Sequence, residues 1–199
     1  EITLEANPGT FEQEKFNDFR HAGINRLSIG IQTFNPEHLQ TLGRIHDDRQ
    51  AHAAVDTARK AGLENINLDL MFGLPQQSTA QALADIETAC RFEVPHISHY
   101  QLTIEANTYF HKHTPVLPES DDLWEMQTQC QQHLAAQGYR QYEISAYSQP
   151  GRECLHNTNY WQFGDYIGIG AGAHGKLTQY ENDGYRITRS WKHRQPQQY

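Results

Sequence analysis

Apolar and polar residues alternate along several short segments of the chain, and stretches with helical spacing separate these segments. Residues 26–34, RLSIGIQTF, show the alternation clearly. One side of this predicted strand carries Leu27, Ile29 and Ile31, and the other side carries Ser28, Gly30 and Gln32. Strands of a covered parallel sheet are usually apolar on both faces. The polar side of this segment therefore indicates that it faces a cavity.

The same pattern predicts a series of strands joined by helices. The predicted strands cover residues 1–7, 26–34, 65–72, 96–104 and 141–147. The predicted helices cover residues 11–22, 48–61, 78–91 and 121–136, and a short helix opens at Asn35-Pro36. Strands that alternate with helices over short connections indicate a parallel sheet with the helices outside.

Two architectures have this element order, a doubly wound open sheet and a (β/α) barrel. Polar sides recur on three predicted strands, as Thr3, Glu5 and Asn7, then Ser28, Gly30 and Gln32, then Asn67, Asp69 and Met71. Both faces of an open sheet covered by helices are buried and therefore apolar, whereas the inner side of a barrel around a ligand can be polar. We therefore expect an α/β fold, a partial (β/α) barrel with parallel strands inside and helices outside. The alternative is that Gln32 and Asp69 are satisfied polar residues in a packed barrel centre.

Composition narrows the function classes. The chain has 199 residues and a net charge of −8, so a nucleic-acid partner has no electrostatic support. No apolar run is long enough to span a membrane. The cysteines Cys90, Cys130 and Cys154 are far apart, which argues against a disulfide framework and against a metal or cluster site built from them alone. We expect a reducing compartment, the cytoplasm.

Five segments then occur in one order along the chain. They are EITLEANPG at 1–9, RLSIGIQTF at 26–34, LGRIHD at 42–47, NINLDLMFGLP at 65–75 and YQLTIEANT at 100–108. This set resembles the radical S-adenosylmethionine (SAM) enzymes of the oxygen-independent coproporphyrinogen III oxidase family, and within that family the haem chaperone branch. The resemblance implies a partial radical SAM barrel over residues 1–175 and the truncated start of a C-terminal extension over residues 176–199.

The resemblance also implies roles for individual residues. Glu5 resembles the acidic residue that helps to hold SAM, and Gln32 the glutamine that reaches the SAM ribose. Arg44 resembles the arginine that pairs with the SAM carboxylate, and Asp69 the aspartate that binds the ribose or nearby polar atoms. The chemistry agrees, because hydroxyls suit carboxylate and amide acceptors and a guanidinium offers a forked bond to a carboxylate. Taken alone, Arg44 could equally be a solvated arginine after a short helix.

The family's C-x-x-x-C-x-x-C cluster loop and its glycine-rich SAM turn do not occur in these 199 residues. Residues 1–7 already read as a strand and Glu1 has no Met before it, so we expect these pieces upstream, in a larger protein. Residues 1–199 alone are then expected neither to assemble the [4Fe–4S] cluster nor to cleave SAM, although the complete protein could.

The segment HNTNYW, residues 156–161, matches the H-N-x-x-Y-W signature of the haem chaperone branch. The resemblance makes His156 a candidate axial haem ligand through a neutral imidazole nitrogen, with Tyr160 and Trp161 offering apolar faces to the porphyrin. The alternative is a surface histidine near a helix start, followed by two core aromatics. The oxidase branch departs from the signature here, so the segment favours the chaperone.

A G-x-G-x-x-G match at Gly170, Gly172 and Gly175 does not indicate a dinucleotide site, because the residues after it read as turn and strand and not as a helix.

These observations predict a protein that binds SAM and, in its full-length form, a [4Fe–4S] cluster, and that binds haem for transfer to acceptor haemoproteins. A peripheral association with a membrane is left open. One alternative is an oxygen-independent coproporphyrinogen III oxidase of porphyrin biosynthesis. A remote alternative is a barrel hydrolase that uses Glu5 and Asp69 as paired carboxylates, with Arg44 binding an anionic group of the substrate.

Overall fold

The computed structural model describes residues 1–10, 13–44 and 48–198. The predicted start of the first helix, residues 11–12, and residues 45–47 of the LGRIHD segment lie outside this description. The chain divides into two compact units, Glu1–Glu153 and Cys154–Tyr199, which are described one at a time.

The first unit is built on a six-stranded sheet in the order β1-β2-β3-β4-β6-β5. β1 (Thr3–Ala6), β2 (Arg26–Gln32), β3 (Ile66–Phe72) and β4 (His96–Gln101) are parallel neighbours. β6 (Ala146–Ser148) pairs antiparallel with β4 and with the edge strand β5 (Arg140–Gln141). This mixed, mostly parallel sheet with its helices is consistent with a partial barrel, so the predicted fold class is confirmed.

The prediction of one continuous strand over residues 141–147 is wrong, because this segment belongs to a hairpin of β5 and β6. Local side-chain bonds close the turn between them. The Glu143 carboxylate accepts hydrogen bonds from the backbone nitrogen and the hydroxyl of Ser145, at 2.8 and 3.0 Å. Gln141 Nε2 also donates to the Ile144 carbonyl at 3.0 Å. Such bonds compete with a strand ladder, and here they reverse the chain and make the pairing antiparallel.

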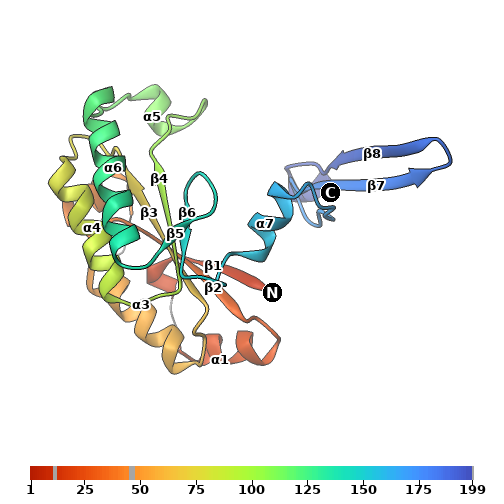
Figure 1. Ribbon diagram of the computed structural model, residues 1–199, viewed down its shortest axis with the longest axis horizontal. Helices are drawn as coiled ribbons and strands as arrows, with labels where there is room; N and C mark the ends of the chain where they lie inside the picture. Colours follow the sequence, from red (N-terminus) through yellow and green to blue (C-terminus); the bar gives the residue numbers. More distant parts are fainter. Residues whose placement is uncertain (11–12, 45–47, 199) are drawn as a thin grey trace. The chain divides into compact units, whose positions relative to one another are not determined.

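Helices precede and follow the parallel strands. They are η1 (Pro8–Thr10), α1 (Gln13–His21), α2 (Pro36–Thr41), α3 (Asp48–Lys60), α4 (Thr79–Arg91), α5 (Tyr109–Lys112) and α6 (Ser120–Ala136). Figure 1 shows α4 and α6 side by side along one face of the sheet. α4 begins with a capping box, in which Ser78 and Gln81 satisfy each other's backbone nitrogens.

The core lies between the helices and one face of the sheet. The strands contribute the apolar sides that the sequence predicted, with Leu27, Ile29, Ile31, Ile66, Leu68, Leu70 and Ile97 fully buried. α3 presents Ala51, Ala54, Val55 and Ala58, whose small side chains allow the helix to approach the sheet closely. Each buried Leu or Ile contributes about 1.5–3 kcal/mol. The helices therefore cover the apolar face, and the polar sides of the strands lie on the other.

The second unit contains α7 (Leu155–Trp161), an antiparallel hairpin of β7 (His174–Glu181) and β8 (Gly184–Trp191), and η2 (Pro196–Gln198). Lys176 in β7 is buried, and its Nζ donates to Asp165 at 2.9 Å and to the Phe163 carbonyl at 2.8 Å. Gly175 of the G-x-G-x-x-G match lies in β7, so a strand follows the glycines, as predicted.

Along the chain, the boundary between the two compact units lies between residues 153 and 154. The barrel boundary predicted between residues 175 and 176 stays a prediction. In the part of the chain that the structure describes, no helix combines the length and the apolar character needed to cross a bilayer.

Candidate functional site

A cavity of about 390 Å³ lies on the polar side of the sheet in the first unit. Its lining residues come from the first four strands and from the segments that follow β1 and α2, and they are Glu5, Ala6, Asn7, Ser28, Gly30, Gln32, Arg44, Asp69 and Tyr100. All four residues that the resemblance linked to SAM are among them. The structure therefore brings Glu5, Gln32, Arg44 and Asp69 together, although their roles toward SAM stay predictions.

Gln32 reaches the cavity through an irregularity at the end of β2. The register between β2 and β3 shifts after Ile29, so that Gln32 stands opposite Leu70. The backbone of Gln32 has a φ of 71°, in the left-handed region that non-glycine residues seldom adopt. Its buried amide oxygen accepts a hydrogen bond from the Tyr100 hydroxyl at 2.7 Å. The strain at this residue is typical of a position that must be aimed at a ligand.

Asp69 is held by neighbouring side chains on the cavity floor. Its two oxygens accept from Ser28 Oγ at 2.9 Å and from Asn67 Nδ2 at 2.8 Å. Burial raises the pKa of Asp69, the hydrogen bonds from Ser28 and Asn67 lower it, and the nearby Glu5 charge raises it. The carboxylate is thus fixed in orientation and keeps lone pairs for donors supplied by a ligand.

Arg44 supplies positive charge at the cavity. Its Nη1 donates to Asn7 Oδ1 at 2.9 Å, so that the amide of Asn7 orients the guanidinium. Glu5 lies at the exposed side of the same cavity, at the end of β1. Burial and the negative charge of Asp69 raise the pKa of Tyr100, which keeps its hydroxyl protonated as a donor to Gln32.

No site role was predicted from the sequence for Asn7, Ser28, Gly30 or Tyr100. The alternation did place the first three on polar sides, but a small or amide side chain carries no chemical signal of its own. Tyr100 shares its side of β4 with His96 and Ser98, and that alternation was the available signal for it.

The residues present fit SAM. The nucleoside's ribose offers two hydroxyl donors, and Asp69 and the Gln32 oxygen are acceptors on the cavity wall. The amino acid part of SAM carries a carboxylate, for which the Arg44 guanidinium is the matching partner. The arrangement can therefore hold a ligand that combines hydroxyl groups with a carboxylate.

The cysteines of the first unit do not fit an iron–sulfur cluster. Cys90 lies in α4 and Cys130 in α6, both on the helical side of the sheet. Burial raises the pKa of the Cys90 thiol to about 11 and that of Cys130 to about 12. Because cluster ligands are thiolates, these two residues are unsuited to the role.

His156 belongs to the second unit and is the second residue of α7. It is exposed, and its Nδ1 lies 3.1 Å from Cys154 Sγ. Tyr160 and Trp161 in the same helix are about half exposed, so they are not the core aromatics of the alternative interpretation. Tyr160 packs edge-on against Tyr166, with ring centroids 4.8 Å apart.

The chain is similar to proteins of known family. A model of the radical SAM superfamily matches residues 1–89. The haem chaperone HemW of Escherichia coli is 55% identical over 196 residues, which cover 98% of this chain and 51% of that protein. HemW of Bacillus subtilis is 40% identical over 181 residues, with 89% and 48% covered. The chain thus spans about half the length of the curated relatives it matches.

A solved structure shares the fold. The structure of coproporphyrinogen III oxidase HemN from E. coli, described as a radical SAM enzyme, aligns with a TM-score of 0.82 and 20% identity. The alignment covers 100% of this chain and 48% of that protein. At this identity the likeness shows the fold and leaves activity aside.

Proposed function

The chain belongs to the radical SAM superfamily, and on this premise we propose that the cavity on the polar side of the sheet binds S-adenosylmethionine. The observation that carries the proposal is that Glu5, Gln32, Arg44 and Asp69 line one cavity. These residues come from separate segments of the sequence, and a packed barrel centre would not need an arginine, two carboxylates and an amide around a common space.

The division of labour follows from the chemistry of each side chain. Asp69 and Gln32 accept hydrogen bonds from the ribose hydroxyls, and Arg44 pairs with the carboxylate of the amino acid part. Glu5, at the exposed end of β1, contributes a negative charge that favours the cationic parts of the ligand. The superfamily implies SAM and a [4Fe–4S] cluster as cofactors, and the cluster supplies the electron for SAM chemistry when both are bound.

Two ligands distinguish the loss of the Arg44 contact from a general loss of binding at the site. SAM carries the carboxylate, whereas 5′-methylthioadenosine has the same nucleoside without the amino acid. We expect Arg44→Gln to weaken SAM binding by about 10- to 100-fold, because a hydrogen bond to a charged group contributes roughly 1.5–3 kcal/mol. Binding of methylthioadenosine should be unchanged. Calorimetric titration of the anaerobically reconstituted full-length protein measures both.

Asp69→Asn provides the complementary variant, because it should weaken both ligands. Arg91→Gln, at the exposed end of α4, serves as the control for the loss of a positive charge elsewhere. Equal weakening of both ligands in Arg44→Gln would contradict the assigned contact, and a full-length protein that binds neither ligand would refute the SAM site.

For the whole protein we propose a haem chaperone that carries its [4Fe–4S] cluster on cysteines other than Cys90, Cys130 and Cys154. Support comes from the HemW name of relatives with 55% and 53% identity. The resemblance of HNTNYW, residues 156–161, to the signature of the haem chaperone branch adds to it. Haem and acceptor haemoproteins are then the partners, in the cytoplasm, with a peripheral membrane association as part of delivery. Anaerobic reconstitution with iron and sulfide should give a cluster absorbance, and failure to form one would count against the proposal.

We propose His156 as the axial haem ligand of this protein. His156→Ala should shift the Soret band of the haem complex and weaken haem binding, because the iron loses its imidazole ligand. His174→Ala, in β7 of the same unit and exposed as well, is the matched control and should leave the spectrum unchanged. Identical Soret bands and affinities in wild type and His156→Ala would remove His156 as the ligand.

Two alternatives predict different measurements. A coproporphyrinogen III oxidase would decarboxylate its substrate anaerobically, which the chaperone would not do. A hydrolase that uses Glu5 and Asp69 explains why two carboxylates share the cavity, but it leaves Gln32 and the HNTNYW segment without a role. The signature at residues 156–161 is the observation that favours the chaperone.

A further inference from the structure

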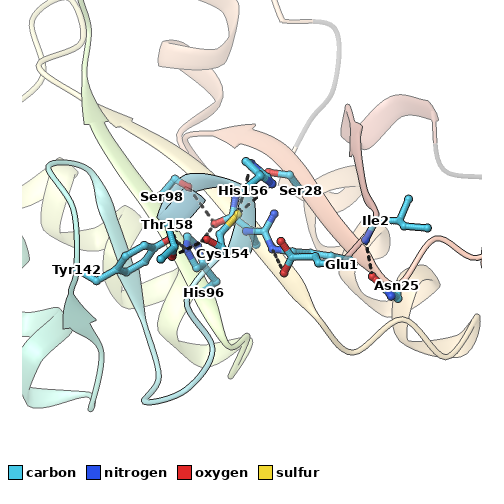
Figure 2. A network of polar contacts seen from close by, with 12 residues as sticks. Glu1, Ile2, Asn25, Ser28, His96, Ser98, Tyr142, Cys154, His156 and Thr158 are labelled. Carbon is cyan, nitrogen blue, oxygen red and sulfur yellow. Dashed lines mark hydrogen bonds and ion pairs between the residues drawn. The ribbon is translucent and has the colours of Figure 1, made fainter. Parts of the chain in front are cut away.

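A chain of hydrogen bonds, buried around Asn67, leads from the cavity to a histidine that does not line it. Asn67 Nδ2 donates to Asp69 Oδ1 at 2.8 Å and to Ser28 Oγ at 2.7 Å. On its other side, Asn67 Oδ1 lies 2.6 Å from His96 Nδ1. His96 Nε2 in turn lies 2.7 Å from the Tyr142 hydroxyl, and Figure 2 shows these two rings next to each other.

The polarity of this chain is fixed at its cavity end. An ionised Asp69 can only accept hydrogen bonds, so the amide nitrogen of Asn67 must point toward it. The amide oxygen of Asn67 then faces His96, and Nδ1 of the histidine must carry a proton to donate to it. In the neutral ring Nε2 is left as an acceptor, and the Tyr142 hydroxyl is the donor that satisfies it.

From this geometry we infer that His96 is a positioning residue of the cavity, which holds Asn67 and through it Asp69 in the orientation that receives the ligand. The inference rests on the proposed SAM site and adds a residue to it. His96 is fully buried at the start of β4, and Asn67 and His96 are register partners across β3 and β4. Ser98 Oγ, on the same side of β4, donates a hydrogen bond to the same Asn67 oxygen at 3.1 Å.

The arrangement has a functional reason. A flipped Asn67 amide would present its oxygen to the Asp69 carboxylate and remove the donor that orients this carboxylate. A donor at His96 Nδ1 makes the flipped amide unfavourable, because the amide nitrogen would then face that donor. The ring thus reinforces the amide orientation that Asp69 requires, and the Tyr142 hydroxyl, which can donate or accept, donates to the remaining ring nitrogen.

Ring nitrogens can be observed directly in the wild-type full-length protein with ¹⁵N-labelled histidine. Long-range ¹H–¹⁵N correlation at neutral pH should show His96 as a neutral ring protonated on Nδ1, the less common tautomer in solution. A ring protonated on Nε2 alone would overturn the inference. This measurement needs no SAM, so it stands apart from the proposed function, and the signals missing in His96→Asn assign the ring.

Affinity for SAM tests whether His96 acts through Asp69. We expect His96→Leu to weaken SAM binding about tenfold, since the buried Asn67 oxygen loses the nearer of its two donors and keeps only Ser98 Oγ. In the double variant His96→Leu with Asp69→Asn, the loss should equal that of Asp69→Asn alone, because the two positions act in series. His96→Asn keeps a donor near the Nδ1 position and should restore most of the affinity that His96→Leu loses.

His99→Leu is the matched control. His99 is buried in the same strand but faces the core, where its ring packs on Phe72 with centroids 4.7 Å apart. Its loss should leave SAM affinity unchanged at temperatures where the protein stays folded. Losses from His96→Leu and Asp69→Asn that simply multiply would overturn the positioning role, while a wild-type protein that does not bind SAM would refute the proposed function instead.

Discussion

Gly30 is the smallest residue on the cavity wall, and its neighbours leave little room for a larger one. A Cβ at this position would lie 2.9 Å from Gln32 Nε2 and 3.3 Å from Asn7 Oδ1. Both atoms are ends of side chains and can move, so a methyl group would displace them without breaking the strand. The residue therefore matters more to the aim of Gln32 than to the stability of the sheet.

Gly30→Ala should weaken SAM binding about tenfold through the displaced amide of Gln32, with a change of only about 1 kcal/mol in the free energy of unfolding. Gly9→Ala is the control, because a Cβ there meets nothing within 4 Å. Calorimetric titration and urea unfolding of the full-length variants measure the two quantities. A loss of stability with unchanged affinity would show that Gly30 is structural.

The sequence could predict the charged and amide residues of the cavity, because Glu5, Gln32, Arg44 and Asp69 carry groups that match a ligand. It could not predict how Gln32 is aimed. The direction of its side chain depends on a backbone φ of 71°. Glycine adopts such a φ more readily, and no feature of RLSIGIQTF predicts it at Gln32. The roles of Asn67 and His96 likewise depend on register between strands, and register is a property of the folded sheet.

Among the elements, α4 and the turn after β2 are joined by a buried carboxylate. Asp85 in α4 accepts from Thr33 Oγ1 at 2.7 Å and from the Phe34 backbone nitrogen at 2.8 Å. Thr33 Oγ1 also accepts from the Asn35 nitrogen at 3.0 Å, and Asn35 caps α2. Because this turn directly follows Gln32, the tie fixes the end of β2 at the cavity.

Burial raises the pKa of Asp85 to about 6, above its ordinary value, while the bonds from Thr33 and Phe34 lower it. A raised pKa stabilises the folded state below the pKa of the unfolded chain, and this contribution is lost as the pH rises through about 6. We expect the unfolding free energy of wild type relative to Asp85→Asn to fall by up to about 3 kcal/mol between pH 4 and pH 7.

Urea unfolding at several pH values measures this difference, and taking it against Asp85→Asn removes the titration of other groups. Asp56→Asn, exposed in α3, is the control and should run parallel to wild type. A difference that grows with rising pH would contradict the assignment, because it would mean that the ionised form of Asp85 is the stabilised one.

The helices and the parallel strands could be predicted from the sequence, because their apolar residues recur with the period of a helix or of a strand. α4, predicted over residues 78–91, begins at Thr79 and ends at Arg91. The hairpin of β5 and β6 was not predictable from the same pattern. Residues 141–147 alternate well enough for one strand, but the bonds of Gln141 and Glu143 to the turn, together with a backbone bond from Tyr142 to Ala146, hold the chain in a reversal.

For the whole molecule, the two proposed ligands belong to different compact units. The SAM cavity is lined entirely by residues of Glu1–Glu153, and His156 lies in Cys154–Tyr199. A ligand that binds only the folded state stabilises it by about 2.7 kcal/mol at one hundred times its dissociation constant. Each ligand should therefore protect the backbone of the unit that holds it.

Hydrogen exchange of the full-length protein can test this assignment. SAM should slow exchange at the carboxyl ends of β1, β2 and β3, and haem should slow exchange in α7. Peptides from α3, on the helical side of the sheet, serve as the internal control for a global change of stability. If SAM added without haem protected α7, or haem added without SAM protected the strand ends, the assignment of the two ligands to different units would be wrong.

The shift of pairing in β2 makes the length of a strand part of the ligand site. From Ile29 to Gln32 the strand advances three residues while β3 advances two, from Leu68 to Leu70. If Ile31 were deleted, the two strands would run in step, and the glutamine would take a place on the apolar face beneath the helices. A single missing codon could then abolish ligand recognition without touching any contacting side chain, and alignments that treat this segment as freely gapped would misplace the residue that matters.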